Sequence, residues 1–184
     1  MPRFYIVFVS IMSTFYMTTA GAVQPHISKY SGQEKRVIKS LSADDIKQLE
    51  QGKGWGLAKA AELNGVPGPI HILQMKDKIS LSDEQEVKIK ALYADMKFSA
   101  IPLGKQLIKL EKELNDSFAN KTVNRESLMQ QLAAIAEISK KLRYVHLATH
   151  LETPGILSTQ QIHQYNQLRG YNKGGMHHKN MHSH

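Results

Sequence analysis

The sequence predicts an all-α fold, in which a long antiparallel helical hairpin is braced by shorter helices. Two long segments, 82–118 and 124–151, repeat apolar residues at helical spacing with polar residues between them. Several segments begin with a serine that can cap a helix, and no segment alternates apolar and polar residues for long enough to form a strand. The chain contains no cysteine, so its stability must come from the packing of these helices.

The first 22 residues have the organisation of a signal peptide. Arg3 supplies a positive charge, residues 4–17 form an uncharged apolar run, and Ala20 and Ala22 place small residues where a signal peptidase reads them. We therefore expect cleavage after Ala22 and export of the chain. The alternative is an uncleaved membrane anchor, because about twenty apolar residues can just span a bilayer. Several hydroxyl residues dilute the run and favour the signal peptide.

The formal net charge is +8, from 24 basic and 16 acidic residues. For a cytoplasmic protein, this excess would suggest nucleic acid as a partner. An exported chain seldom meets nucleic acid, so we expect acidic or unfolded protein surfaces instead. The same charge would support transient contact with an anionic membrane surface.

Residues 23–40 lack helical periodicity, so we predict a flexible leader ahead of a folded domain at 41–171. The first helix is expected to follow Ser42, whose hydroxyl can cap it. Three glycines surround the only tryptophan, Trp55, and predict a tight corner at 52–56. A phosphate-binding loop is the alternative for this Gly-x-Gly-x-Gly pattern, but no strand precedes it and no Gly-Lys-Ser or Gly-Lys-Thr follows.

Two short helices should follow the corner. Segment 57–63 has helical spacing of apolar residues, and the prolines and glycines between 64 and 69 stop it. Segment 70–79 is predicted to be the second short helix, because Pro69 suits its first turn.

The longest helix is predicted from Ser82 to about Phe118. At 100° per residue, its apolar residues fall within about 80° of one another, a seam suited to packing against another helix. The seam contains Ile89, Leu92, Met96, Ala100, Leu103, Leu107, Leu110, Leu114 and Phe118. The opposite side carries Lys90, Lys97, Lys105, Lys109 and Lys112. This lysine face is either a surface for acidic partners or an ordinary solvated face.

Pro102 removes one backbone hydrogen bond and is expected to bend this helix. The chain should then turn at 119–123 and return as a helix that Asn124 caps. The apolar side of the returning helix contains Leu128, Leu132, Ile135, Ile138, Leu142 and Val145. Thr-Pro-Gly at 153–155 should end it, and the last helix should reach Leu168, with Gly170 closing it.

Two of the predicted helix starts repeat one motif. Residues 81–85 read Leu-Ser-Asp-Glu-Gln, and residues 157–161 read Leu-Ser-Thr-Gln-Gln. Each is a capping box, in which the serine hydroxyl accepts from the amide three residues on and the glutamine side chain reaches back to the serine amide. A looser version at 41–45 ends in aspartate.

With one box opening the longest helix and one opening the last, the chain resembles the Spy/CpxP family of periplasmic proteins, whose motif is Leu-Thr-x-x-Gln. Segment 161–171 also resembles the last helix of that family, so the resemblance covers residues 41–171. Serine stands here where the family usually has threonine, a change that keeps the capping hydroxyl.

The resemblance implies a periplasmic, cradle-shaped helical homodimer. It implies that unfolded or misfolded client proteins bind a positive concave face without ATP, or that the protein contacts an envelope-stress sensor. It also implies an alternative, because the related ZraP and CnrX proteins bind metal ions for protection or sensing. No nucleic-acid partner is expected.

The end of the chain is rich in potential metal ligands. Segment 176–184 contains Met176, His177, His178, Met181, His182 and His184. Imidazole suits Cu(II), Ni(II) and Zn(II), and thioether adds affinity for Cu(I), so copper is the ion that uses the whole set. We predict a flexible tail at 172–184 that binds copper, zinc or nickel. A purification tag is the alternative, but the interleaved methionine, lysine and asparagine are unlike one.

His146 and His150 form a second pair with ligand spacing, because residues four apart share one face of a helix. On the helical wheel they coincide with Leu128 and Leu132, inside the apolar side of the helix. They are therefore either metal ligands or buried histidines that hydrogen-bond to their neighbours. A complete metal site would need a third ligand, for which the candidates are His71, Glu152 and His163.

Motifs of enzymatic catalysis are absent: the sequence has no cysteine, no Gly-x-Ser-x-Gly and no His-Glu-x-x-His. We therefore expect a protein that is not an enzyme and requires no cofactor. The leading hypothesis is a periplasmic, ATP-independent chaperone or envelope-stress-response protein of the Spy/CpxP type, modulated by metal. The alternative is a periplasmic copper-, zinc- or nickel-binding resistance or sensor protein, and a plain interaction module is the third hypothesis.

Overall fold

The computed structural model describes residues 27–171. The predicted signal peptide and the predicted histidine- and methionine-rich tail lie outside the described residues. Every helix belongs to one compact unit that begins at Gln33. Within the described range the chain is mostly helical and contains no strand, so the predicted all-α class is confirmed.

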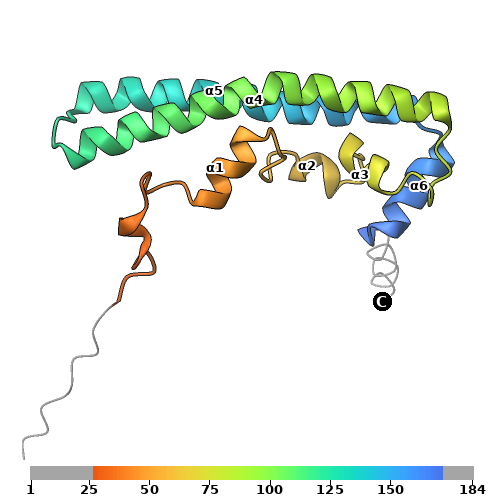
Figure 1. Cartoon of the computed structure of the whole chain (residues 1–184), viewed down its shortest axis with the longest axis horizontal. Coiled ribbons are helices and arrows are strands. Elements are labelled where there is room, and N and C mark those ends of the chain that lie inside the picture. The colour runs from red at the N-terminus through yellow and green to blue at the C-terminus, as the bar shows by residue number, and fades with distance from the viewer. Residues whose placement is uncertain (1–26, 172–184) are drawn as a thin grey trace, which may run out of the picture. The chain divides into compact units, whose positions relative to one another are not determined.

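Two long helices dominate this unit (Figure 1). Helix α4 (Asp83–Ala119) and helix α5 (Arg125–Glu152) lie side by side in opposite directions. We call them the long helix pair. Helix α4 passes through Pro102 without ending. None of the helices in residues 27–171 is both long and apolar enough for a membrane crossing.

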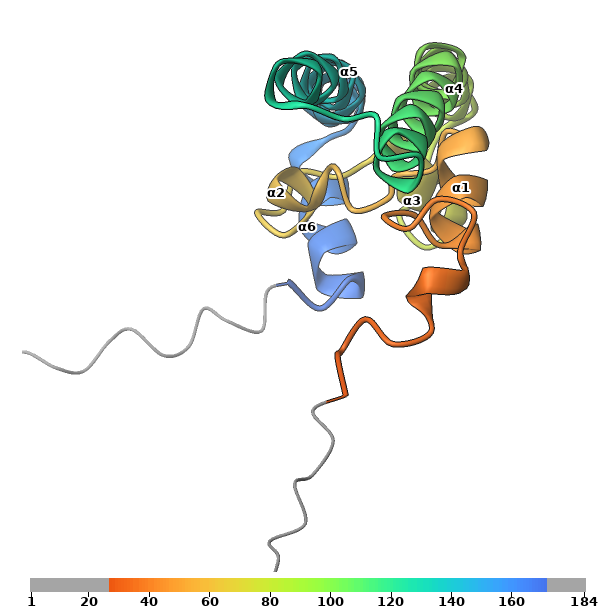
Figure 2. The same ribbon diagram turned by 90° about the vertical axis from the view of Figure 1, so that its left-hand side faces the viewer.

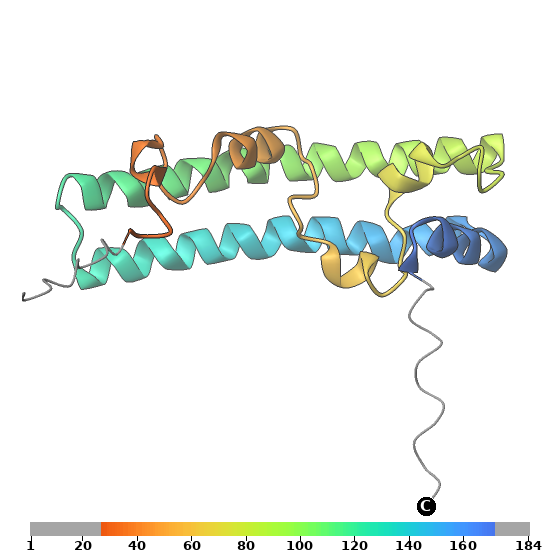
Figure 3. The ribbon, with the colours of Figure 1, turned by 90° about the horizontal axis from the view of Figure 1, so that it is seen from below.

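The shorter helices lie along one side of the long helix pair (Figure 2). They are α1 (Ala43–Glu50), α2 (Lys59–Glu62), α3 (Pro69–Gln74) and α6 (Thr159–Leu168), with the 3-10 helices η1 (Gln33–Lys35) and η2 (Thr153–Ile156). Helices α1 and α3 pack on α4, and α2 packs on α5. Figure 3 shows that α2 and α6 cover only the C-terminal part of α5.

Four of the predicted helix starts are confirmed, whereas the predicted helices at 57–63 and 70–79 are shorter, as α2 (Lys59–Glu62) and α3 (Pro69–Gln74). Ser42, Ser82, Asn124 and Ser158 each cap a helix, and each accepts a hydrogen bond from the backbone amide three residues on. In all four cases the side chain at that third position accepts a hydrogen bond from the backbone amide of the cap residue. Local capping chemistry therefore sets where these helices begin.

The predicted corner at 52–56 is also present. Gly52, Trp55 and Gly56 have φ angles of 60°, 42° and 72°, in the left-handed region. This conformation is costly for tryptophan, and the indole Nε1 donates a 2.8 Å hydrogen bond to the Asp45 carboxylate. The corner thus returns the chain toward α1 and places the tryptophan side chain.

Helix α1 crosses α4 at very close range. Gly104 is buried within α4, and a Cβ atom there would overlap the backbone carbonyl of Leu49 in α1. Only glycine permits this approach of two backbones. The contact helps to fix α1, and with it the corner that follows, on the long helix pair.

The core consists of two clusters of buried side chains. The first joins α1 to the long helix pair and contains Ile38, Leu41, Leu49, Ala100, Leu107, Ile138 and Leu142. The second joins α3 and α6 to α4 and contains Ile72, Ile79, Ile89 and Tyr165. Burial of these side chains supplies the main favourable free energy of the fold.

Contacts with the folded unit begin a few residues before Leu41. Ile38 is only 3% exposed and belongs to the first cluster. The Lys39 amide donates to the Asn115 side chain at 3.2 Å, and the Ser40 hydroxyl donates to Glu111 at 2.7 Å. The last residues of the predicted leader are therefore packed on α4. The sequence pattern did not indicate this packing, because a single buried apolar side chain produces no periodicity.

Candidate functional site

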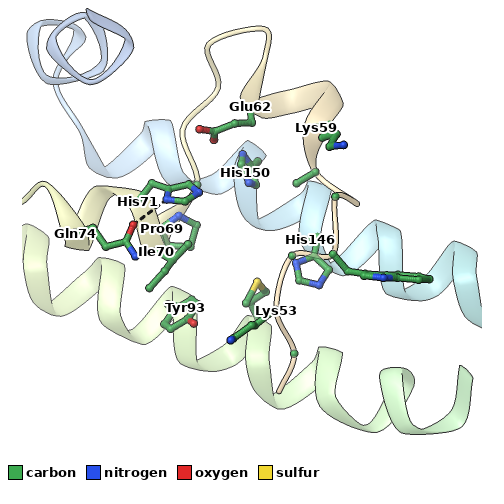
Figure 4. A pocket seen from close by; sticks show the side chains of 17 residues that line it. Lys53, Lys59, Glu62, Pro69, Ile70, His71, Gln74, Tyr93, His146 and His150 are labelled. Atoms are coloured by element: carbon green, nitrogen blue, oxygen red, sulfur yellow. Dashed lines mark hydrogen bonds between the residues drawn. The ribbon is translucent and has the colours of Figure 1, made fainter. Parts of the chain in front are cut away.

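A pocket lies between α5 and the shorter helices and has a volume of about 470 Å³ (Figure 4). Its walls come from the corner at 52–56, from α2 and α3, and from the facing sides of α4 and α5. His146 and His150 both line it, one helical turn apart on α5. The tertiary structure thus directs this predicted pair into a cavity rather than into a continuous apolar core.

The His146 side chain is almost completely buried. The residue is 3% exposed, and its Nε2 atom has no hydrogen-bond partner. Burial, together with the nearby His150, lowers the pKa of His146 to about 4. The imidazole is therefore neutral near pH 7, and a neutral imidazole can donate a lone pair to a metal ion.

His150 links α5 to the loop that precedes α3. Its Nδ1 lies 2.8 Å from the carbonyl oxygen of Val66. Because a carbonyl oxygen can only accept, Nδ1 carries the proton and Nε2 carries the lone pair. That Nε2 lies against Gly68, where a Cβ atom would collide with it. His150 therefore meets the structural expectation, a hydrogen bond to a neighbouring segment, and keeps an unprotonated nitrogen in the pocket.

Of the three candidates for a third ligand, His71 is the one in this pocket. It lies on α3, and its Nδ1 is 2.9 Å from the side-chain oxygen of Gln74. Glu152 and His163 are exposed and do not line the pocket. Among residues 27–171, no three histidine, aspartate or glutamate side chains are placed closely enough to hold a metal ion as they stand.

Glu62 is a pocket residue that sequence reasoning missed. One of its carboxylate oxygens accepts hydrogen bonds from the hydroxyls of Tyr165 (2.6 Å) and Tyr171 (2.8 Å) and from Arg169 (3.0 Å). Its other oxygen, Oε2, is buried and has no partner. No local signal could have identified this residue, because its partners lie more than 100 positions away in the sequence.

The environment of Glu62 keeps it ionised. Burial raises its pKa, but hydrogen bonds from Tyr165 and Tyr171 and the charge of Arg169 outweigh burial and lower it. Burial and the same hydrogen bond raise the pKa of Tyr165. The pocket wall therefore contains a carboxylate with one fully used and one unused oxygen.

The two Ser-x-x-Gln boxes are in direct contact. The Gln85 amide donates to the Gln161 side-chain oxygen at 3.0 Å, and the Gln161 amide donates to the Gln85 oxygen at 2.9 Å. Each glutamine also accepts from its own cap amide, and their amide groups donate to the carbonyls of Ile156 and Ser80. The boxes thus start α4 and α6 and also join them, which requires a side chain that both donates and accepts.

Three of the five lysines on the lysine face of α4 lie next to a carboxylate on the same helix. Lys90 pairs with Glu86 (2.6 Å), and Lys112 pairs with Asp116 (2.5 Å). Lys109 lies 3.8 Å from a carboxylate oxygen of Glu113. Exposed pairs one turn apart stabilise a helix only weakly because solvent screens them, but they reduce the positive potential that the sequence suggested.

A second candidate surface lies near the turn that joins α4 to α5. Phe118 is 56% exposed and Leu132 is 45% exposed, although both belong to the predicted apolar sides. Leu114 and Leu128 next to them are half-buried. We call these four residues the open seam. Leu114 and Phe118 also line a groove of about 470 Å³ beside Lys39 and Glu111.

Helical periodicity shows that the open seam continues the face that the shorter helices cover elsewhere. Eighteen residues make five turns, so residues 18 apart lie on one face, about 27 Å apart. Met96 and Ala100 thus share a face with Leu114 and Phe118, as His146 and His150 do with Leu128 and Leu132. Met96, Ala100 and the two histidines lie under the shorter helices. The open seam is exposed because α2 and α6 do not extend over the N-terminal part of α5 (Figure 3).

Comparisons of the whole chain with protein-family models, with curated proteins and with solved structures gave no match.

The predicted tail ligands lie outside the described residues. They are Met176, His177, His178, Met181, His182 and His184.

Proposed function

We propose that this protein is an exported, periplasmic, ATP-independent chaperone or envelope-stress-response protein of the Spy/CpxP type, which binds unfolded or misfolded proteins. The observation that carries the proposal is the open seam, an apolar face that continues along the long helix pair beyond the shorter helices. Exposed apolar surface of this kind marks sites that contact other apolar chains.

The energetics of the open seam suit reversible binding. Fully burying a leucine or phenylalanine side chain gains about 1.5–3 kcal/mol, and Phe118 and Leu132 have roughly half of that still to gain. An unfolded segment that covers both would gain a few kcal/mol before the cost of ordering it. A gain of that size is smaller than the roughly 4 kcal/mol of a millimolar complex, so the open seam would act together with other contacts to the client, and release would need no energy source.

The proposed fold is the Spy/CpxP hairpin, assembled as a homodimer. Support comes from the antiparallel long helix pair and from the contact between the two Ser-x-x-Gln boxes that carry the resemblance. Dimerisation would place two open seams in one particle and raise the effective concentration of binding surface for a long client chain.

The test is suppression of client aggregation in the presence of a chelator. Phe118→Ser should weaken protection roughly tenfold in the concentration required, because about 1.4 kcal/mol corresponds to tenfold in affinity. Phe98→Ser is the matched control, because Phe98 is 84% exposed but lies opposite the seam on α4. Failure of the unmodified chain to protect at stoichiometric amounts would rule out the chaperone. Equal losses in both variants would rule out the open seam.

The second candidate function is a metal-binding resistance or sensor protein. It is favoured by a specific observation, the presence of His71, His146 and His150 around one pocket. The test is calorimetric titration with Cu(II), Zn(II) and Ni(II). Affinity no better than that of a generic peptide, unchanged when the four tail histidines are replaced by alanine, would remove this candidate.

A further inference from the structure

We propose that the pocket between α3 and α5 is a transition-metal site, in which His71, His146 and His150 act as ligands together with the unused carboxylate oxygen of Glu62. The site goes beyond the proposed chaperone activity. It deepens the second candidate function, on which it rests, because it assigns ion binding to the folded domain rather than to the tail.

Hydrogen bonds already hold two of the rings in the tautomer that a metal requires. His150 donates from Nδ1 to the Val66 carbonyl, and His71 lies with Nδ1 2.9 Å from the Gln74 side-chain oxygen. In both rings the lone pair is therefore on Nε2. A carbonyl or amide oxygen on the far nitrogen is the usual outer partner of a metal-bound histidine, because it fixes the ring orientation and raises the basicity of the ligand.

Two further donor atoms in the pocket have no partner of their own. The Nε2 atom of His146 and the Oε2 atom of Glu62 are both buried without a hydrogen bond. Leaving such atoms unpaired costs about 1–3 kcal/mol each. An ion that received both lone pairs would recover that cost.

The donors come from opposite walls of the cavity. Figure 4 shows His146 and His150 projecting from α5, with His71 on α3 and Glu62 on α2 across from them. The cavity of about 470 Å³ has ample room for an ion, and the Glu62 carboxylate would offset part of the ion's charge. Lys53 and Lys59 also line the pocket, but both are exposed and can extend into solvent.

Ion binding requires the four side chains to move closer together than they are in this structure. No three of these side chains surround a common point within residues 27–171 as they stand. His146 and His150 sit on a long helix, whereas His71 sits on the six-residue helix α3 that follows Gly68. We therefore expect α3 to move toward α5 when the ion binds, and the bound ion to raise the unfolding temperature by mass action.

The donor set selects the class of ion. Three imidazoles and one carboxylate favour Zn(II), Cu(II) or Ni(II) over Mg(II) or Ca(II), which prefer oxygen ligands. Four donors also match the coordination number that zinc adopts in proteins.

Trp55 provides a direct readout, because it is the only tryptophan and it lines the same pocket. The full chain is stripped with chelator and titrated with Cu(II), which quenches indole emission at short range, and in parallel with Zn(II) by calorimetry. His71→Ala should weaken both affinities roughly tenfold or more. His163→Ala is the matched control, because His163 is exposed on α6 outside the pocket. A second variant, His71→Gln, serves if His71→Ala lowers the unfolding temperature of the metal-free chain.

The tail is controlled separately by replacing His177, His178, His182 and His184 with alanine. Quenching of Trp55 that survives this change, and survives His163→Ala, supports the pocket. Quenching that disappears with the tail histidines and is unchanged in His71→Ala overturns the proposal and assigns binding to the tail. Absence of quenching and of heat with every ion overturns both the pocket and the second candidate function. Client protection in chelator is measured independently, so the chaperone proposal does not depend on any of these outcomes.

Discussion

The contact between Gln85 and Gln161 makes a sharp prediction about a nearly isosteric substitution. Gln161→Glu keeps the oxygen that accepts from the Ser158 amide at 2.9 Å, so the capping box itself survives. The substitution replaces the amide group that donates to the Ser80 carbonyl at 3.2 Å and to the Gln85 oxygen at 2.9 Å. An oxygen with lone pairs would then face two acceptors.

The magnitude follows from the two lost hydrogen bonds. Each hydrogen bond contributes a net of about 0.5–1.5 kcal/mol, so Gln161→Glu should lower the free energy of unfolding by about 2 kcal/mol. For a domain of this size, that loss corresponds to a decrease in unfolding temperature of roughly 4–8 °C. The new negative charge lies in the first turn of α6, where its interaction with the helix dipole offsets about 0.3–1 kcal/mol of that loss.

Thermal unfolding followed by circular dichroism and by Trp55 emission measures the loss. Gln160→Glu is the matched control, because Gln160 is its neighbour in the first turn of α6 and is exposed. The control carries the same gain from the helix dipole without breaking the contact, and should be neutral or slightly stabilising. If Gln161→Glu is as stable as Gln160→Glu, the contact between the boxes does not stabilise the fold, and the reasoning is wrong.

Three further substitutions test other parts of the structure by urea unfolding in chelator. Gly104→Ala should destabilise by about 1–3 kcal/mol, because the new methyl overlaps the backbone of α1. Gly155→Ala is the control and should not destabilise the fold, because its Cβ would meet nothing within 4 Å. The unfolded chain takes up a proton on His146 near pH 6.5, whereas the folded chain does so only near pH 4. Stability should therefore fall by roughly 1.4 kcal/mol per unit as the pH decreases through this window, and His146→Leu should abolish that slope; an unchanged slope would contradict the assignment. Tyr165→Phe should cost about 1–2 kcal/mol through the lost hydrogen bond to Glu62, and an equally stable variant would show that this bond contributes nothing.

The sequence by itself determined the helical class and the helix starts at Ser42, Ser82, Asn124 and Ser158. These features depend on residues three or four positions apart, so capping chemistry and the 3.6-residue period were sufficient to read them. The pairing of lysines with carboxylates on the lysine face is also local, because the carboxylates lie one turn away along α4. Sequence reasoning likewise placed His146 and His150 on one helix face.

Only the tertiary structure decided which of these features meet. Gln85 and Gln161 are 76 positions apart, and Glu62 and Tyr165 are 103 positions apart, so no periodicity relates the members of either pair. The docking of the shorter helices covers one end of a uniform apolar face and leaves the open seam at the other. The same docking selects His71 over His163 for the pocket and buries Ile38 ahead of the predicted boundary. Packing of whole elements governs these contacts, and it depends on the shape of every surface at once rather than on any short stretch of residues.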